Sequence, residues 1–81
     1  MFTKLHDRIQ VIGIFTFKGF IPKKFQWKDK VYLINQVTLV SDVKDGGLRQ
    51  RWYSVEVRGN VYRLLYNRDH DEWWLEEVYV G

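Results

Sequence analysis

The apolar residues of this 81-residue chain fall into short runs rich in β-branched and aromatic side chains, with turn-forming residues between them. This distribution is typical of β-strands. No window repeats its apolar residues with the period of an amphipathic helix. The chain is therefore predicted to be all-β, and the strand-forming runs cover residues 9–17, 25–27, 31–40, 50–57, 61–66 and 73–80.

Turn signals separate these runs. Gly59-Asn60 lies between two runs and favours a tight hairpin, and Asp45-Gly46-Gly47 favours a somewhat longer one. Residues 67–71 form a polar connection, and residues 28–30 mark a further turn. Because short connections join antiparallel neighbours, the chain from Phe25 onward is expected to be a meander.

Several predicted strands carry apolar side chains on both faces, and such a sheet must curl on itself, be covered on its second face or dimerise. We favour an all-β, strongly bent antiparallel meander of five to six strands that forms a small open barrel, with residues 1–81 as a single domain. Residues 1–7 can be a flexible N-terminus. The chain has no cysteine, and its 14 aromatic residues supply the large buried area that a small core needs.

The last run reads EWWLEEVYV and cannot alternate strictly without placing a glutamate among apolar side chains. Burying an unpaired carboxylate is costly. A β-bulge at Glu76-Glu77 removes the conflict, because the extra residue lets both glutamates face outward. The bulge predicts that Trp74 and Tyr79 also face outward and that four residues face the core, namely Trp73, Leu75, Val78 and Val80.

The net charge of +3 is unevenly distributed along the chain. Residues 1–30 carry seven basic and two acidic side chains, whereas residues 69–81 carry five acidic and no basic ones. The two ends are expected to pair with each other rather than to attract a partner. No run is long and uncharged enough for a membrane-spanning helix, and residues 1–10 lack the apolar region of a signal peptide, so a cytoplasmic location is expected.

A set of aromatic and apolar positions resembles a small bacterial domain of unknown function. The positions are Pro22-x-x-Phe25-x-Trp27, Tyr32, Arg51-Trp52-Tyr53-x-Val55, Gly59, Tyr62-x-Leu64 and Trp73-x-Leu75-x-x-Val78. That domain also occurs beside or fused to proteins similar to Y-family DNA polymerases in mutagenic repair. The resemblance covers residues 8–80 and implies a compact β domain with a link to DNA transactions. It departs at Asp29, where such domains usually carry glycine.

Catalysis finds little support in the sequence, and no enzymatic activity, metal or cofactor is expected. Neither His6 nor His70 stands near a serine at a recognisable spacing, and no glycine-rich phosphate loop is present. Residues 69–72 include metal-ligand types, but neighbouring residues of one loop rarely converge on one ion. We therefore interpret them as a solvated turn.

A basic and aromatic stretch, residues 18–30, is the best binding candidate. Five lysines surround Phe20, Phe25 and Trp27, and single-strand binders combine a cationic groove with exposed rings on which bases stack. Phe25 and Trp27 are two residues apart and share one strand face, which can equally belong to the core. In that case only the lysines remain for a phosphate backbone.

The two functional hypotheses are a non-catalytic accessory or protein-interaction module with an unknown protein partner, and single-stranded nucleic-acid binding linked to DNA repair. The first would use exposed aromatic residues, and the second would use a patch of lysines and arginines. The candidate binding surface comprises Lys23, Lys24, Lys28, Lys30, Arg49, Arg51, Arg63, Trp52, Trp74 and Tyr79.

Overall fold

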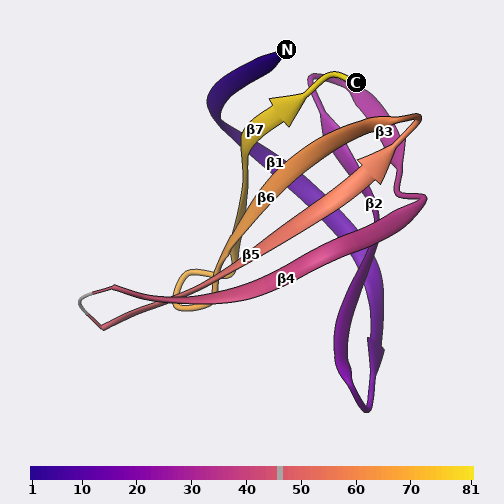
Figure 1. Cartoon of the computed structure of the whole chain (residues 1–81). Coiled ribbons are helices and arrows are strands. Elements are labelled where there is room, and N and C mark those ends of the chain that lie inside the picture. The colour runs from indigo at the N-terminus through magenta and orange to yellow at the C-terminus, as the bar shows by residue number, and fades with distance from the viewer. Residues whose placement is uncertain (46) are drawn as a thin grey trace.

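The computed structural model describes residues 1–45 and 47–81, and this part of the chain forms one antiparallel sheet of seven strands (Figure 1). The strands are β1 (Phe2–Thr16), β2 (Gly19–Trp27), β3 (Lys30–Leu33), β4 (Gln36–Asp45), β5 (Leu48–Val57), β6 (Asn60–Asn67) and β7 (Glu72–Tyr79). Their order in the sheet is β3-β2-β1-β7-β6-β5-β4. The all-β antiparallel fold is confirmed, but the expected five to six strands are seven.

Two differences explain the higher strand count. The strand β2 begins at Gly19, well before the run that the sequence indicated, and the run 31–40 is divided into β3 and β4. At the division, the Ile34 N–H donates to the Lys23 carbonyl at 2.9 Å, and the Asn35 N–H donates to the Glu56 carbonyl at 2.8 Å. These two residues bridge β2 and β5, so β3 and β4 lie at opposite edges of the sheet. The expected meander from Phe25 onward is therefore interrupted.

The first and last strands join the two parts of the sheet. The sequence left open whether the N-terminal residues are flexible. Residues 2–7 belong to β1, where Phe2 is opposite Tyr79 and Ile9 is opposite Trp73. The N-terminal ammonium group of Met1 also donates to the Val80 carbonyl at 2.9 Å. Pairing between the two ends of the chain makes one compact domain from a β1–β2–β3 meander and a β4–β7 meander.

The sheet curls into an open half-barrel (Figure 1), as its two-sided apolar pattern predicted. Alternate side chains of each strand point to its inner face, where they form the core. The buried core residues are Ile9, Phe25, Tyr53, Val55, Val57, Tyr62, Leu64, Leu75 and Val78. The far end of the β1–β2 hairpin projects away from this core.

Tight turns lie where the sequence indicated them. Lys28 and Asp29 have φ angles of 50° and 63°, and Arg58 and Gly59 have φ angles of 51° and 83°. Positive φ at both central residues is the geometry of a type I′ hairpin, whose twist matches that of the flanking strands. The second turn is centred one residue before the Gly59-Asn60 pair. The predicted Asp45-Gly46-Gly47 turn includes Gly46, which lies outside the described residues.

The predicted bulge in the last strand is confirmed. On β6, Arg63 and Leu64 are consecutive, but their β7 partners are Glu77 and Leu75, so Glu76 is the additional residue. Leu75 and Val78 are buried as predicted, and Trp73 packs against the core while still partly exposed. The prediction for Val80 is wrong, because Val80 lies beyond the end of β7 and is 50% exposed.

Candidate binding surfaces

A row of apolar side chains crosses the outer face of the sheet. Trp52 on β5 is opposite Leu65 on β6, and Leu65 is opposite Trp74 on β7. Their sequence neighbours Tyr53, Leu64 and Leu75 are buried in the core. Because successive side chains of a strand alternate between faces, the row lies on the other side of the sheet. Two of the predicted binding aromatics are thus brought into one line.

Trp74 is partly covered by side chains from β1. The His6 ring stacks on it with centroids 4.1 Å apart and an interplanar angle of 2°, and the Arg8 guanidinium lies 5.5 Å from the ring centroid. The His6 Nδ1 is 2.6 Å from Glu76 Oε2, and Arg8 pairs with Glu72 at 3.1 Å. Trp74 therefore has a structural role in holding β1 against β7, and this role could not be identified from the sequence.

The other two predicted aromatics are also in contact with neighbours. The Arg63 guanidinium lies 4.5 Å from the centroid of the Trp52 ring, a cation–π contact across two strands. The Tyr79 ring stacks on Phe2 at 4.8 Å, and Tyr79 is 39% exposed. Trp52, Trp74 and Tyr79 therefore each have a neighbouring side chain against the ring, which leaves less ring surface for a partner to stack on.

The three candidate arginines are all held by carboxylates. Arg49 pairs with Asp69 at 3.1 Å, Arg51 with Asp42 at 2.7 Å, and Arg63 with Glu77 at 3.2 Å. The last two pairs are directly opposite residues of neighbouring strands, whereas Asp69 lies in the β6–β7 loop. The hydrogen bond that Arg51 donates to Asp42 raises the pKa of Arg51 above its ordinary value, and a smaller effect comes from Tyr53. Most of the charge of these arginines is therefore balanced within the fold.

The four candidate lysines lie elsewhere, on β2, β3 and the turn between them. Within residues 1–45 and 47–81, no ion pair involves Lys23, Lys24, Lys28 or Lys30. Phe25 is buried, and the Trp27 indole donates to Asp7 Oδ2 at 2.8 Å, so the face that they share belongs to the core. Because β2 and β3 are not neighbours of β5 and β6 in the sheet, lysines and arginines do not lie on adjacent strands.

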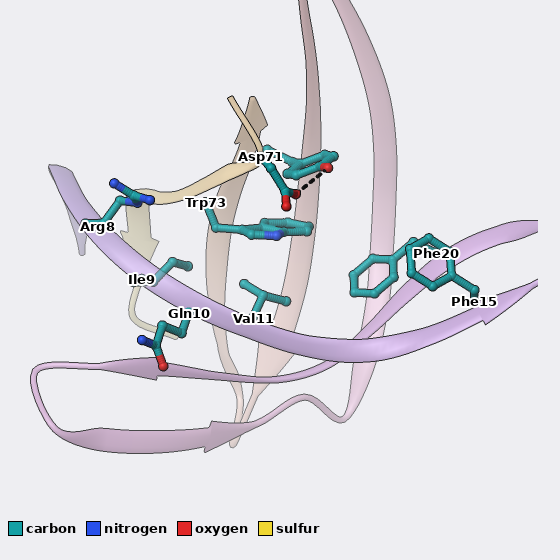
Figure 2. A pocket seen from close by; sticks show the side chains of 9 residues that line it. Arg8, Ile9, Gln10, Val11, Phe15, Phe20, Asp71 and Trp73 are labelled. Carbon is teal, nitrogen blue, oxygen red and sulfur yellow. Dashed lines mark hydrogen bonds between the residues drawn. The ribbon is translucent and has the colours of Figure 1, made fainter. Parts of the chain in front are cut away.

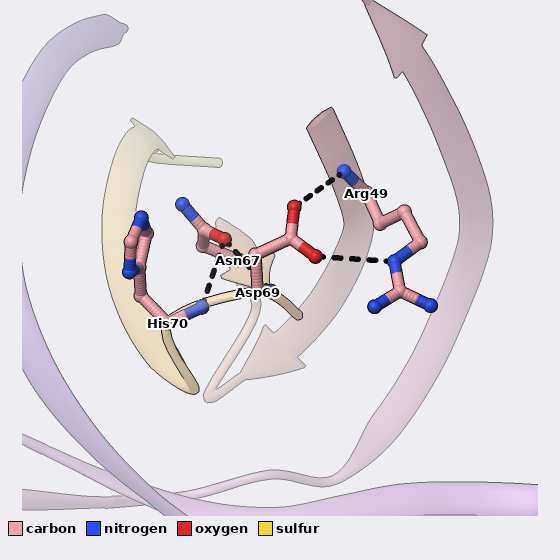
Figure 3. A network of polar contacts seen from close by, with 4 residues as sticks. All are labelled: Arg49, Asn67, Asp69 and His70. Atoms are coloured by element: carbon pink, nitrogen blue, oxygen red, sulfur yellow. Dashed lines mark hydrogen bonds and ion pairs between the residues drawn. The ribbon is translucent and has the colours of Figure 1, made fainter. Parts of the chain in front are cut away.

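The polar loop between β6 and β7 is a hydrogen-bonded turn (Figure 3). Asn67 Oδ1 accepts from the N–H groups of Asp69 and His70, at 3.1 and 3.3 Å. The Asp69 carboxylate accepts from the Arg49 N–H at 3.3 Å and from its Nε at 3.1 Å. Among the described residues, no cluster of three metal-ligating side chains is present. Asp69 thus stabilises the turn, whereas Asp71 accepts a hydrogen bond from Tyr66 and Glu72 pairs with Arg8.

The Asp69 carboxylate is expected to titrate below the ordinary aspartate value of about 3.9. The Arg49 backbone N–H lowers the pKa of Asp69, and the Arg49 side chain lowers it further. A depressed pKa in the folded state contributes stability above the unfolded-state pKa, and this contribution is lost as the pH falls through the folded pKa. NMR titration of the side-chain carboxyl carbon measures the value.

Arg49→Ala provides the control for this titration. It removes the guanidinium but keeps the backbone donor, so the Asp69 pKa should rise only part of the way toward its ordinary value. An Asp69 pKa at or above the ordinary value in the unsubstituted protein would contradict the network in Figure 3.

A cavity of about 450 Å³ opens at the inner face, beside the base of the β1–β2 hairpin (Figure 2). Its apolar lining consists of Ile9, Val11, Phe15, Phe20, Tyr66 and Trp73. The Trp73 ring stacks on Tyr66 with centroids 4.6 Å apart and lies 5.8 Å from the Phe20 ring. Sequence reasoning assigned Trp73 to the core and missed the cavity. The sequence did contain a signal for it, because Phe15 and Phe20 flank the Lys18-Gly19 turn and a hairpin there places the two residues opposite each other.

Three polar or charged residues also line this cavity. Arg8, Gln10 and Asp71 contribute to its lining. The Tyr66 hydroxyl donates to Asp71 Oδ1 at 2.8 Å, and this hydrogen bond is the main cause of a raised Tyr66 pKa. Asp71 has a φ of 53°, in the left-handed region that non-glycine residues seldom adopt. The turn thus holds a carboxylate beside an aromatic cavity.

The projecting end of the β1–β2 hairpin, residues 12–21, is here called the arm. Phe15 and Phe17 near its tip are 85% and 98% exposed. Ile12 and Ile14 on the same strand are also exposed. Sequence reasoning took 9–17 as an ordinary strand and did not select these residues, although FTFKGFI places three phenylalanines around a Lys-Gly turn.

A comparison of the chain with protein-family models, curated proteins and solved structures finds no match. In the described part of the chain, no helix has the length and apolar character needed to cross a membrane.

Proposed function

We propose that the protein is a non-catalytic protein-interaction module that binds its partner through the arm. The observation that carries this proposal is the near-complete exposure of Phe15 and Phe17 at the end of a projecting hairpin. Small domains usually bury their aromatic residues, and clustered exposed ones are a common feature of binding surfaces.

The energetics of aromatic burial support the arm as a binding element. An aromatic side chain that becomes buried in a partner removes a large apolar area from water, and such residues dominate interface energies. Lys18 lies at the turn of the arm, and Lys23 and Lys24 follow it on β2. A partner surface with an apolar pocket and acidic surroundings would complement these features.

Phe17→Ser is expected to weaken partner binding about tenfold or more, the loss typical of a buried aromatic anchor. The domain should keep its stability, because Phe17 is 98% exposed. The measurement begins with proteins recovered by the immobilised chain from an extract of its source cells. Each recovered protein is then titrated against the wild type and the variant.

The matched control is Leu39→Ser, which removes an aliphatic side chain that is 53% exposed on the edge strand β4. A specific partner should bind this variant as tightly as the wild type. Partners that bind Phe17→Ser as tightly as the wild type would overturn the proposal. Equal losses in both variants would indicate non-specific apolar capture and would also overturn it.

Nucleic-acid binding is the second candidate, and one observation favours it. The lysines of β2 and β3 have no ion-pair partners among the described residues, in contrast to the three arginines. If DNA is the ligand, the resemblance to domains found beside Y-family polymerases would connect it with repair. On this hypothesis, contacts are made by Lys23, Lys24, Lys28 and Lys30 with phosphates, and base stacking contributes little.

The two candidates differ in their dependence on salt. A single-stranded oligonucleotide should shift amide resonances of residues 23–30, and its affinity should fall steeply as salt is raised, because phosphate contacts release counterions. An apolar contact at the arm should weaken little under the same change. If the oligonucleotide causes no shifts in residues 23–30 at low salt, the nucleic-acid hypothesis is excluded.

A further inference from the structure

The cavity beside the arm combines aromatic walls with a single uncompensated charge. Figure 2 shows Trp73 on one side and Phe15 and Phe20 on the other. The ring of Tyr66 lies against Trp73, and its hydroxyl holds the Asp71 carboxylate at the same site. A volume of about 450 Å³ is within the usual range for small-ligand pockets.

The local electrostatics favour a cation. Arg8 also lines the cavity, but its guanidinium pairs with Glu72 at 3.1 Å and lies near the Trp74 ring on the outer face. The charges of Arg8 and Glu72 therefore compensate each other. Asp71 accepts a hydrogen bond from the neutral Tyr66 hydroxyl and has no ion-pair partner among the described residues. Arg8 and Asp71 are the two charged residues of the lining, and the charge of Arg8 is balanced by Glu72, which lies outside the lining.

We propose that this cavity binds an alkylammonium group, such as a quaternary or methylated ammonium. The faces and edges of aromatic rings can surround the methyl groups, and a cation near aromatic rings gains electrostatic attraction from them. Asp71 supplies the counter-charge. The cavity shares Phe15 with the arm, whereas Phe17 does not line it, so Phe17 variants separate this proposal from partner binding by the arm.

The hydrogen-bonding capacity of the site argues against a guanidinium ligand. A guanidinium group presents five N–H donors in a planar fork, and burying it requires several acceptors. The cavity lining includes one carboxylate, of which one oxygen is already engaged by Tyr66. A methylated ammonium needs no hydrogen-bond acceptors and therefore fits the aromatic lining better.

Choline and 3,3-dimethylbutan-1-ol test the proposal, because they have nearly the same shape and differ in charge. We expect choline to shift the indole N–H resonance of Trp73 in a saturable manner, and the neutral alcohol to bind at least about tenfold more weakly. A parallel titration with N-acetyl-trimethyllysine methylamide distinguishes the source of the group. Tighter binding of choline supports a free small molecule, and tighter binding of the amide supports a modified protein side chain.

Asp71→Asn provides the charge control. Asparagine tolerates a positive φ and keeps an oxygen that can accept from Tyr66, so the fold should be preserved while the charge is lost. Choline affinity should fall about tenfold in this variant and in Phe15→Ala, which removes part of the wall, and should be unchanged in Phe17→Ala. Equal affinity for choline and the alcohol, no saturable shift at millimolar choline, or unchanged choline affinity in Asp71→Asn would overturn the proposal.

Discussion

Trp73→Ala is expected to lower the free energy of unfolding by about 3 kcal/mol, the lower end of the usual loss for a large aromatic side chain, because Trp73 packs against the core but is partly exposed beside the cavity. The Trp73 ring contacts Tyr66 at 4.6 Å, Tyr53 at 5.2 Å and Phe20 at 5.8 Å between centroids. Removing it would leave a gap between the β1–β2 hairpin and the rest of the core. For so small a domain, this loss is a large part of the total stability.

The neighbouring tryptophan is the matched control. Trp74 lies on the outer face beneath His6 and Arg8, so Trp74→Ala should remove one stacking and one cation–π contact, at about 1 kcal/mol. Urea unfolding followed by far-ultraviolet circular dichroism measures both variants and does not depend on tryptophan fluorescence. Equal losses in the two variants would contradict the assignment of the two rings to opposite faces.

The sequence predicted that Trp73 and Trp74 lie on opposite faces, because a bulge was the one low-energy way to keep the two glutamates of the last strand out of the core. Strict alternation would have placed Glu76 or Glu77 among apolar side chains, and a single additional residue avoided that outcome. The prediction failed at Val80, where the strand has already ended. Alternation indicates which face a residue occupies, but the end of a strand depends on whether the neighbouring strands have backbone N–H and C=O groups available to pair with it.

The strand count could not be predicted in the same way. Residues 31–40 read as one run, and their division at Ile34 and Asn35 depends on hydrogen bonds to Lys23 and Glu56, which are distant in sequence. The pairing of β1 with β7 is likewise a contact between the two ends of the chain. Local propensity carries no information on either feature, because both are decided by the closure of the whole sheet.

The candidate binding surface was chosen by residue type, and the sheet order separates its basic residues. The sequence grouped the lysines of β2 and β3 with Arg49, Arg51 and Arg63, whereas the sheet order puts them on strands that are not adjacent. Carboxylates of neighbouring strands and of the β6–β7 loop then balance the arginines. The exposure of Phe15 and Phe17 was missed because a strand run of apolar residues was assumed to be buried.

The second large effect is expected from Gly13→Ala, at the base of the arm. A Cβ atom at Gly13 would lie 2.2 Å from the Ile21 carbonyl oxygen and 2.6 Å from Cζ of Phe20. The carbonyl belongs to the paired strand and cannot rotate away, so β1 and β2 must separate locally. Overpacking of this kind typically costs about 1–3 kcal/mol.

Gly13→Ala should also move Phe20 relative to Trp73, because the added methyl group contacts both the Phe20 ring and the β2 backbone. Urea unfolding gives the loss of stability, and the Trp73 indole N–H resonance reports the change in the cavity. Ile12→Ala, at the preceding residue, is the control, since that side chain is 59% exposed and lies on the opposite face. A wild-type stability and an unchanged indole resonance in Gly13→Ala would show that the two strands do not approach each other this closely, and the arm would then have to leave the core at a different angle.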